Sequence, residues 1–178
     1  MLIKLNTFLS VAQIVQPFLE IYQNDKPLMP FLAEDIFKMT KLYLEHFSVL
    51  KDDVFIKIST VVKLIKFDFL DLEHFQEKNK VSLGFISDKI IKEKLFKKEI
   101  TADDLMDLKY GVQRFILTMF HNLFLKCPVR YLLVRSVCCI DPRMMENDPV
   151  NSKTKLKQVL HQLVEKKNNY QRKMEMVF

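Results

Sequence analysis

The sequence has 178 residues and a net charge of +6, and 49% of its residues are hydrophobic. The hydrophobic fraction argues against a disordered chain, and the length suffices for one domain with at most an appendage. Its only glycines are Gly84 and Gly111. This scarcity counts against a β-sandwich, a barrel or a hairpin-rich fold, and it excludes a P-loop and a dinucleotide-binding fingerprint.

The N-terminal third predicts two amphipathic helices. Residues 5–22 carry an apolar seam at steps of three and four, and we expect Pro17 to kink or break this helix near residues 13–16. The seam consists of Leu5, Phe8, Ala12, Val15, Leu19 and Tyr22. A second helix is predicted to begin at Pro30 or Phe31. Its stripe is Leu32, Ile36, Met39, Tyr43 and Phe47.

The middle of the chain is less regular. Residues 54–69 fit both β-branched alternation and helical spacing, and we favour a helix because no partner strand is evident. Residues 68–80 are charged and predict a loop. A short helix is then expected from Ser87, as its N-cap, to about Phe96.

The clearest helix is predicted to begin at Thr101, where Asp104 completes a capping box, and to end at Cys127-Pro128. Its apolar stripe is Leu105, Leu108, Val112, Phe115, Met119 and Leu123. Because Phe120 and Phe124 widen the apolar face, we expect this helix to be central.

Two further helical segments follow. Residues 129–140 predict a short helix that Asp141-Pro142 closes, and a last helix runs from about Ser152 to beyond Tyr170. The seam of the last helix is Leu156, Val159, Leu163, Tyr170, Met174 and Val177. Packing within the chain and docking to a partner are equally compatible with this seam.

Together these elements predict an all-α fold, an irregular multi-helix domain of about six helices with a basic C-terminal helix. We place the helical domain at residues 1–150 and the basic helix at residues 151–178, either separate or packed on the same domain.

The basic charge is concentrated in residues 151–178, which hold seven basic and two acidic residues, whereas residues 1–150 hold 21 basic and 20 acidic residues. Such a helix can contact phosphate, although a solvated face is the commoner interpretation. The candidate DNA-backbone contacts are Lys153, Lys155, Lys157, Lys166, Lys167, Arg172 and Lys173.

No motif indicates a catalytic, cofactor or metal site. Cys127, Cys138 and Cys139 lack the paired spacing of a zinc site, no local signature joins a cysteine to a histidine, and buried thiols are the simpler interpretation. We therefore predict a protein that is not an enzyme, with no cofactor and no evident small-molecule ligand.

The N-terminus lacks the apolar core of a secretory signal, because polar residues such as Asn6 and Gln13 interrupt it. No uninterrupted apolar run approaches the roughly 20 residues of a membrane span. We expect an intracellular protein that makes no membrane contact, with reduced cysteines.

Three segments resemble the hAT superfamily of transposase-like proteins, in the same order and with similar spacing. Residues 11–33 carry PFLEIYQNDKPLMPFLA, similar to the segment that opens the helical part of those proteins. Residues 81–85 read VSLGF, and residues 127–142 read CPVRYLLVRSVCCIDP, both similar to family segments.

In that family, a zinc finger of the BED type binds DNA, and a large helical insertion interrupts an RNase H-like catalytic core. The resemblance implies that this chain corresponds to the helical insertion and its flanks, without the finger or the core. It implies no catalytic residue, and a nuclear location if the DNA role is retained.

Two functional hypotheses follow. The first is a non-catalytic fragment or domesticated remnant of a transposase-like protein, which acts through protein or DNA-backbone contact and binds DNA weakly and non-specifically. The second is a stand-alone helical protein-interaction module, unrelated to transposition, whose apolar seams bind a protein partner or a second copy.

Overall fold

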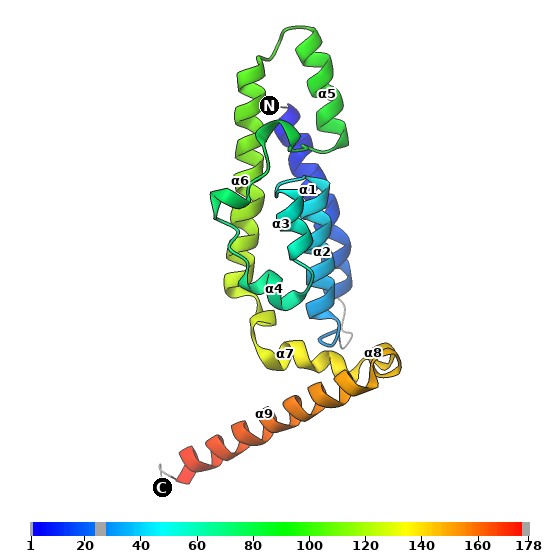
Figure 1. Ribbon diagram of the computed structural model, residues 1–178, viewed down its shortest axis with the longest axis vertical. Helices are drawn as coiled ribbons and strands as arrows, with labels where there is room; N and C mark the ends of the chain where they lie inside the picture. The colour runs from blue at the N-terminus through cyan, green and yellow to red at the C-terminus, as the bar shows by residue number, and fades with distance from the viewer. Residues whose placement is uncertain (1, 24–27, 176–178) are drawn as a thin grey trace. The chain divides into compact units, whose positions relative to one another are not determined.

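Most of the part of the chain that the structure describes is helical. The structure, a computed structural model, describes residues 2–23 and 28–175, with side chains up to Lys167. Those residues form no β-strand, and a single isolated bridge joins Leu50 to Phe75. The all-α prediction is therefore confirmed. The helices are α1 (Leu2–Tyr22), α2 (Leu32–His46), α3 (Asp52–Lys57), α4 (Val61–Lys66), α5 (Phe85–Phe96), α6 (Ala102–Lys126), α7 (Leu132–Ser136), α8 (Pro142–Asn147) and α9 (Pro149–Glu175) (Figure 1).

The chain folds as two compact units. The first contains α1 and residues 35–127, and the second contains residues 28–34 and the chain from Pro128 onward. This boundary lies upstream of residue 150, where we placed the start of the basic helix. The reason is that α7 and α8, together with the short 3-10 helix Val137–Ile140, pack with α9 in the second unit.

The core of the first unit is aromatic and lies between α2 and α6. The ring of Tyr43 meets that of Phe120 edge-on at 5.4 Å, and Phe69 stacks on Phe124 at 5.7 Å. The Tyr43 hydroxyl also donates a hydrogen bond to the backbone carbonyl of Val11 in α1. Burial raises the pKa of Tyr43 to about 12. One tyrosine thus ties α1 to α2 and α6.

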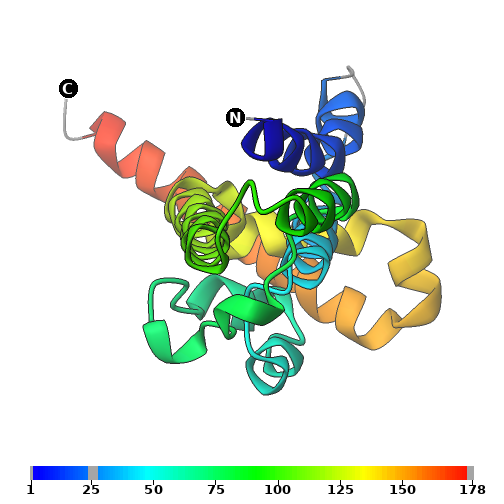
Figure 2. The same ribbon diagram turned by 90° about the horizontal axis from the view of Figure 1, so that it is seen from above.

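On the side of α2 and α6 opposite α1 lies the irregular segment of residues 48–83 (Figure 2). It contains α3, α4 and two short 3-10 helices joined by extended chain. The buried amide of Gln113 on α6 donates to the carbonyls of Val49, at 2.8 Å, and Gln76, at 3.0 Å. Because this amide pairs carbonyls from two separate stretches, it fixes both of them against α6.

The packing face of α1 differs from the predicted one, and the helix continues through Pro17 without a break. Ile3 and Thr7 are buried, whereas Leu5 and Phe8 of the expected seam are 54% and 55% exposed. The Thr7 hydroxyl lies 3.1 Å from the Ser87 hydroxyl of α5, which is itself fully buried. The face of α1 that packs on α5 therefore combines this polar pair with Ile3, which joins Leu83 and Ile91 in an apolar cluster.

Several local predictions are confirmed. α2 begins at Leu32, just after the predicted start at Pro30 or Phe31, and Ile36, Tyr43 and Phe47 of its predicted stripe are buried, while Leu32 and Met39 are half-buried. α6 is capped by Thr101 with the complete capping box to Asp104, and the helix ends before Cys127-Pro128 as expected.

Other local predictions need correction. Ser87 is not the cap of α5, because that helix begins two residues earlier, after Gly84. Residues 54–69 form two short helices, interrupted near Ser59, instead of one. α8 was not predicted as a separate helix, and its N-cap is Asp141, whose carboxylate accepts from the backbone N–H of Arg143 at 3.0 Å.

Gly84 is required where α5 meets α1. Its φ of +93° is a conformation that L side chains rarely adopt, and a Cβ at this position would lie 2.5 Å from the Ser10 hydroxyl oxygen of α1. Gly84→Ala is therefore expected to lower the free energy of unfolding by about 2 kcal/mol or more, measured by urea denaturation.

The matched control is Gly111→Ala, because a Cβ at Gly111 meets no atom within 4 Å. In the middle of α6 this substitution is expected to raise stability by up to about 1 kcal/mol. Equal stability of the Gly84→Ala variant and the native protein would show that the close approach of α1 is not required.

Candidate functional site

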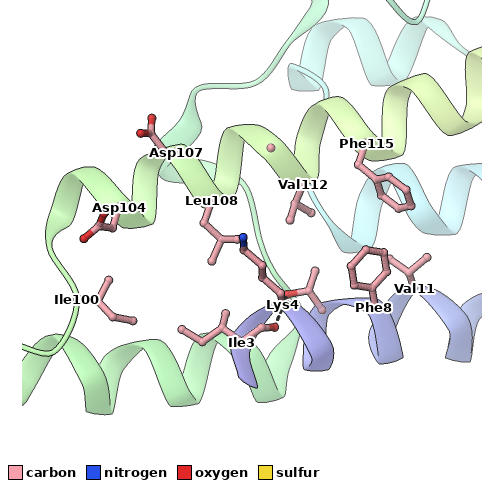
Figure 3. A pocket seen from close by; sticks show the side chains of 12 residues that line it. Ile3, Lys4, Phe8, Val11, Ile100, Asp104, Asp107, Leu108, Val112 and Phe115 are labelled. Carbon is pink, nitrogen blue, oxygen red and sulfur yellow. Dashed lines mark hydrogen bonds between the residues drawn. The ribbon is translucent and has the colours of Figure 1, made fainter. Parts of the chain in front are cut away.

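An apolar groove with a volume of about 630 Å³ lies in the first unit between α1 and α6. Its α1 side includes Ile3 and Phe8, and its α6 side includes Leu108 and Val112, with Ile100 at one end (Figure 3). At the other end the rings of Phe8 and Phe115 meet edge-on at 5.5 Å. A volume of this size lies within the range of ligand-binding cavities.

The α6 wall of the groove is made from a predicted stripe, whereas on the α1 wall only Phe8 belongs to the predicted seam. Leu108, Val112 and Phe115 belong to the stripe that we expected to form the core of α6. The residues of α6 that are buried instead include Ile116, Leu117 and Phe120, on a different side of the helix. Phe115 is 43% exposed and Phe8 is 55% exposed, so the groove keeps large apolar side chains in contact with solvent.

Gly111 lines the groove on α6 without adding a side chain to it. Its position in the middle of a 25-residue helix is unfavourable for helix stability by roughly 1 kcal/mol relative to alanine. A Cβ at Gly111 would meet nothing within 4 Å, so packing inside the chain does not require the glycine. The glycine leaves open space in the wall of the groove.

Three charged side chains line the groove, namely Lys4 on α1 and Asp104 and Asp107 on α6. The Asp104 carboxylate accepts hydrogen bonds from the Thr101 hydroxyl at 2.6 Å and the Thr101 backbone N–H at 3.3 Å. The side-chain hydrogen bond from Thr101, with the backbone one, holds the pKa of Asp104 below its ordinary value. Asp104 is thus committed to the capping box.

The predicted basic contacts lie in the second unit and differ in their surroundings. Lys153 and Lys157 are exposed, whereas Lys155 is half-buried and its Nζ donates to Cys138 Sγ at 3.2 Å. Lys166 and Lys167 are exposed. At the helical rotation of about 100° per residue, Lys153, Lys157 and Lys167 lie within about 80° of one another around α9. The side chains of Arg172 and Lys173 lie outside the described residues.

The predicted seam of α9 is only partly correct. Val159 is buried in the second unit, but Leu156 and Leu163 are 42% and 50% exposed. Tyr170, Met174 and Val177 lie outside the residues whose side chains are described. The exposed aliphatic residues therefore share part of the surface of α9 with the lysines.

The cysteines lie in two places. Cys127 and Cys139 are buried and Cys138 is partly buried, and none of the three forms a disulfide. Burial raises the pKa of the Cys139 thiol. In the part of the chain that the structure describes, no three His, Cys, Asp or Glu side chains group so that they could hold a metal ion.

The apolar character of α1 bears on the expectation about membranes and leaves it untested. By length and composition this 21-residue helix could cross a bilayer, with a mean hydropathy of 1.2 over a window that is 11% buried. The criterion is also met by helices that pack in soluble cores. In this structure α1 packs on α5, and its Val11 carbonyl accepts from Tyr43 of α2.

Sequence reasoning missed Lys4, Asp107 and Gly111 as site residues. Two features of the sequence could have indicated the groove. α1 and α6 carry more apolar residues than one packing face can bury, and Gly111 lies in the middle of the segment with the clearest helical pattern. No local pattern shows that the surplus faces of two helices 100 residues apart meet.

No protein-family model, curated protein or solved structure matches this chain.

The capping box at the edge of the groove predicts a pH dependence. Because the pKa of Asp104 is lowered in the folded state, its contribution to stability is present above the ordinary pKa of 3.8 and is lost as the pH falls through the folded-state pKa. Asp104→Asn is therefore expected to lower the free energy of unfolding at neutral pH. The difference in this free energy between the variant and the native protein should shrink as the pH falls toward about pH 3.

The measurement is urea denaturation across this pH range, with Asp103→Asn as the control, since the box hydrogen bonds are made by Asp104. A difference between Asp104→Asn and the native protein that stays constant with pH would contradict the role of the ionised carboxylate.

Proposed function

We propose that this chain is a helical protein-interaction module whose binding surface is the groove between α1 and α6. The observation that carries the proposal is a groove of about 630 Å³ in which Phe8 and Phe115 remain about half exposed. Apolar side chains that converge on a concave surface gain free energy when a partner removes them from water. The sequence carries no catalytic motif, which favours binding over catalysis.

A helix-in-groove mode fits this surface best. Both walls are α-helices, whose backbone groups are already paired within each helix. An extended peptide would leave its own N–H and C=O groups without partners along such walls, whereas a helix satisfies them internally. An apolar stripe at positions i, i+3 or i+4 and i+7 is the usual way in which such grooves are filled.

Filling the groove tests the proposal. Gly111→Leu places a side chain in the open space on α6 and improves helix propensity, so the variant is expected to fold. A fluorescein-labelled amphipathic peptide of about 16 residues, long enough to be helical, with leucines along one face and glutamines on both flanks, is expected to bind the native chain. We expect Gly111→Leu to weaken this binding at least about tenfold, measured by fluorescence anisotropy.

The matched control is Thr118→Leu, which adds the same side chain at an exposed position of α6 that does not line the groove. This variant is expected to bind the peptide as the native chain does. Equal loss of binding in both variants, or no loss in Gly111→Leu, would assign peptide binding to another surface.

A second candidate function is contact with the DNA backbone through α9. The observation that favours it is the placement of Lys153, Lys157 and Lys167, all exposed, on one side of the helix. This candidate is the one that the resemblance to hAT-superfamily transposase-like proteins suggests. Under it, the chain would be a helical remnant of such a protein, and it would bind duplex DNA weakly and without sequence preference.

The DNA candidate predicts a change in salt dependence. Replacing Lys153 and Lys157 with glutamine is expected to weaken duplex binding and to reduce the slope of log affinity against log salt by about 2, because each phosphate contact contributes about 0.9. Lys155→Gln is the control, because the Lys155 ammonium donates to Cys138 within its own unit. Identical slopes for the double variant and the control would exclude Lys153 and Lys157 from any DNA contact.

A further inference from the structure

We infer that the partner of the groove is an amphipathic helix with basic residues along the flank that meets α6 and acidic residues along the flank that meets α1. This inference rests on the proposed function of the groove as a protein-binding site. It adds the charge pattern, the length and the position of the main anchor of the partner helix.

The charge pattern follows from two side chains of opposite sign on opposite walls. Lys4 and Asp107 line the groove, and within the described residues neither makes a hydrogen bond or an ion pair. Figure 3 shows Lys4 rising from α1 over the groove, and Asp104 and Asp107 along the edge of α6. A helix laid between the two walls would bring one flank to each edge. Opposite charges there would pair, and like charges would repel.

Lys4 on the α1 side of the groove and Asp107 on the α6 side also argue against a purely apolar occupant. A lipid chain or an uncharged helix would be covered by the apolar walls but would leave Lys4 and Asp107 partly desolvated without a counter-charge. An occupant with one basic and one acidic flank satisfies both edges. Two like-charged flanks would satisfy only one edge.

The length of the groove sets the length of the helix. On α6 the lining runs from Asp104 to Phe115, which is about 17 Å at a rise of about 1.5 Å per residue. This is about three turns, enough for apolar anchors at i, i+4 and i+7. Because a Cβ at Gly111 would meet no atom within 4 Å, there is room for a large side chain there, and we place the central and largest anchor against Gly111.

The inference is tested with four peptides that share the same apolar face. The affinity of each peptide for the full chain is measured by fluorescence anisotropy. Their flanks are lysine and glutamate, lysine on both sides, glutamate on both sides, and glutamine on both sides. The native chain is expected to bind the mixed peptide about fivefold more tightly than the glutamine peptide, the gain expected for two exposed ion pairs. The gain should vanish in about 1 M salt, where charges are screened beyond about 3 Å.

Reversing the charge on the α1 wall should then change which of the four peptides binds most tightly. Lys4→Glu makes both edges acidic, so this variant is expected to prefer the all-lysine peptide over the mixed one. Because the comparison is made among peptides on the same variant, a general loss of stability does not imitate the result. Reversing the chain direction exchanges the two flanks of the mixed peptide and leaves the other three peptides equivalent. The mixed peptide is expected to bind the native chain in the one direction that pairs both flanks with opposite charges.

The outcomes separate the two proposals. Equal affinity for the mixed and glutamine peptides, with both weakened by Gly111→Leu, would overturn the charge inference and leave the groove as a protein-binding site. Failure of every peptide to bind would overturn both. Binding of the chain to phosphatidylcholine vesicles in place of every peptide would assign the exposed apolar residues of α1 to lipid and would also overturn both.

Discussion

The irregular half of the first unit depends on the buried amide of Gln113. Its two N–H groups pair with the carbonyls of Val49 and Gln76, which lie in separate extended stretches. An apolar residue at this position would leave the buried Gln76 carbonyl without a donor, at a cost of about 1–3 kcal/mol, and would remove one of the two donors to the Val49 carbonyl. Hydrogen bonds from Gln76 N–H to Val49 and from Ser82 N–H to Phe47 join the same stretches to each other. α6 is thus the element to which both stretches are attached.

This arrangement decides which side of α6 remains available. Gln113, Ile116 and Phe120 are buried in the core, so Leu108, Val112 and Phe115 are left on another side of the helix. α1 is held in turn by two polar contacts, from Thr7 to Ser87 and from Tyr43 to the Val11 carbonyl. These two contacts hold α1 at residues that also line the groove, and Phe8 lies between them in sequence and beside Phe115. The groove therefore follows from the contacts that hold α1 in the first unit.

The two candidate surfaces have different physical characters and belong to different units. The groove is concave and mainly apolar, with one charge of each sign that has no partner in the described chain. The exposed part of α9 is convex and combines lysines with aliphatic residues such as Leu160. A concave apolar surface favours a protein helix, whereas exposed lysines on a convex helix favour an extended polyanion. Substitutions in one unit therefore test one function without altering the side chains of the other surface.

Local chemistry in the sequence determined the helical class, the start of α6 at its capping box and the end of that helix before Pro128. Each of these depends on neighbours within four residues, which a pattern can display. Tertiary structure alone decided which faces of α1 and α6 are buried. Both helices carry more apolar residues than one face can use. The buried faces are those that meet partners distant in sequence: Ser87 and the apolar Leu83 and Ile91 for α1, and the Val49 and Gln76 carbonyls for α6. The groove and its charges arise from that choice, because only the packed chain brings Lys4 of α1 and Asp107 of α6 into the lining of one groove.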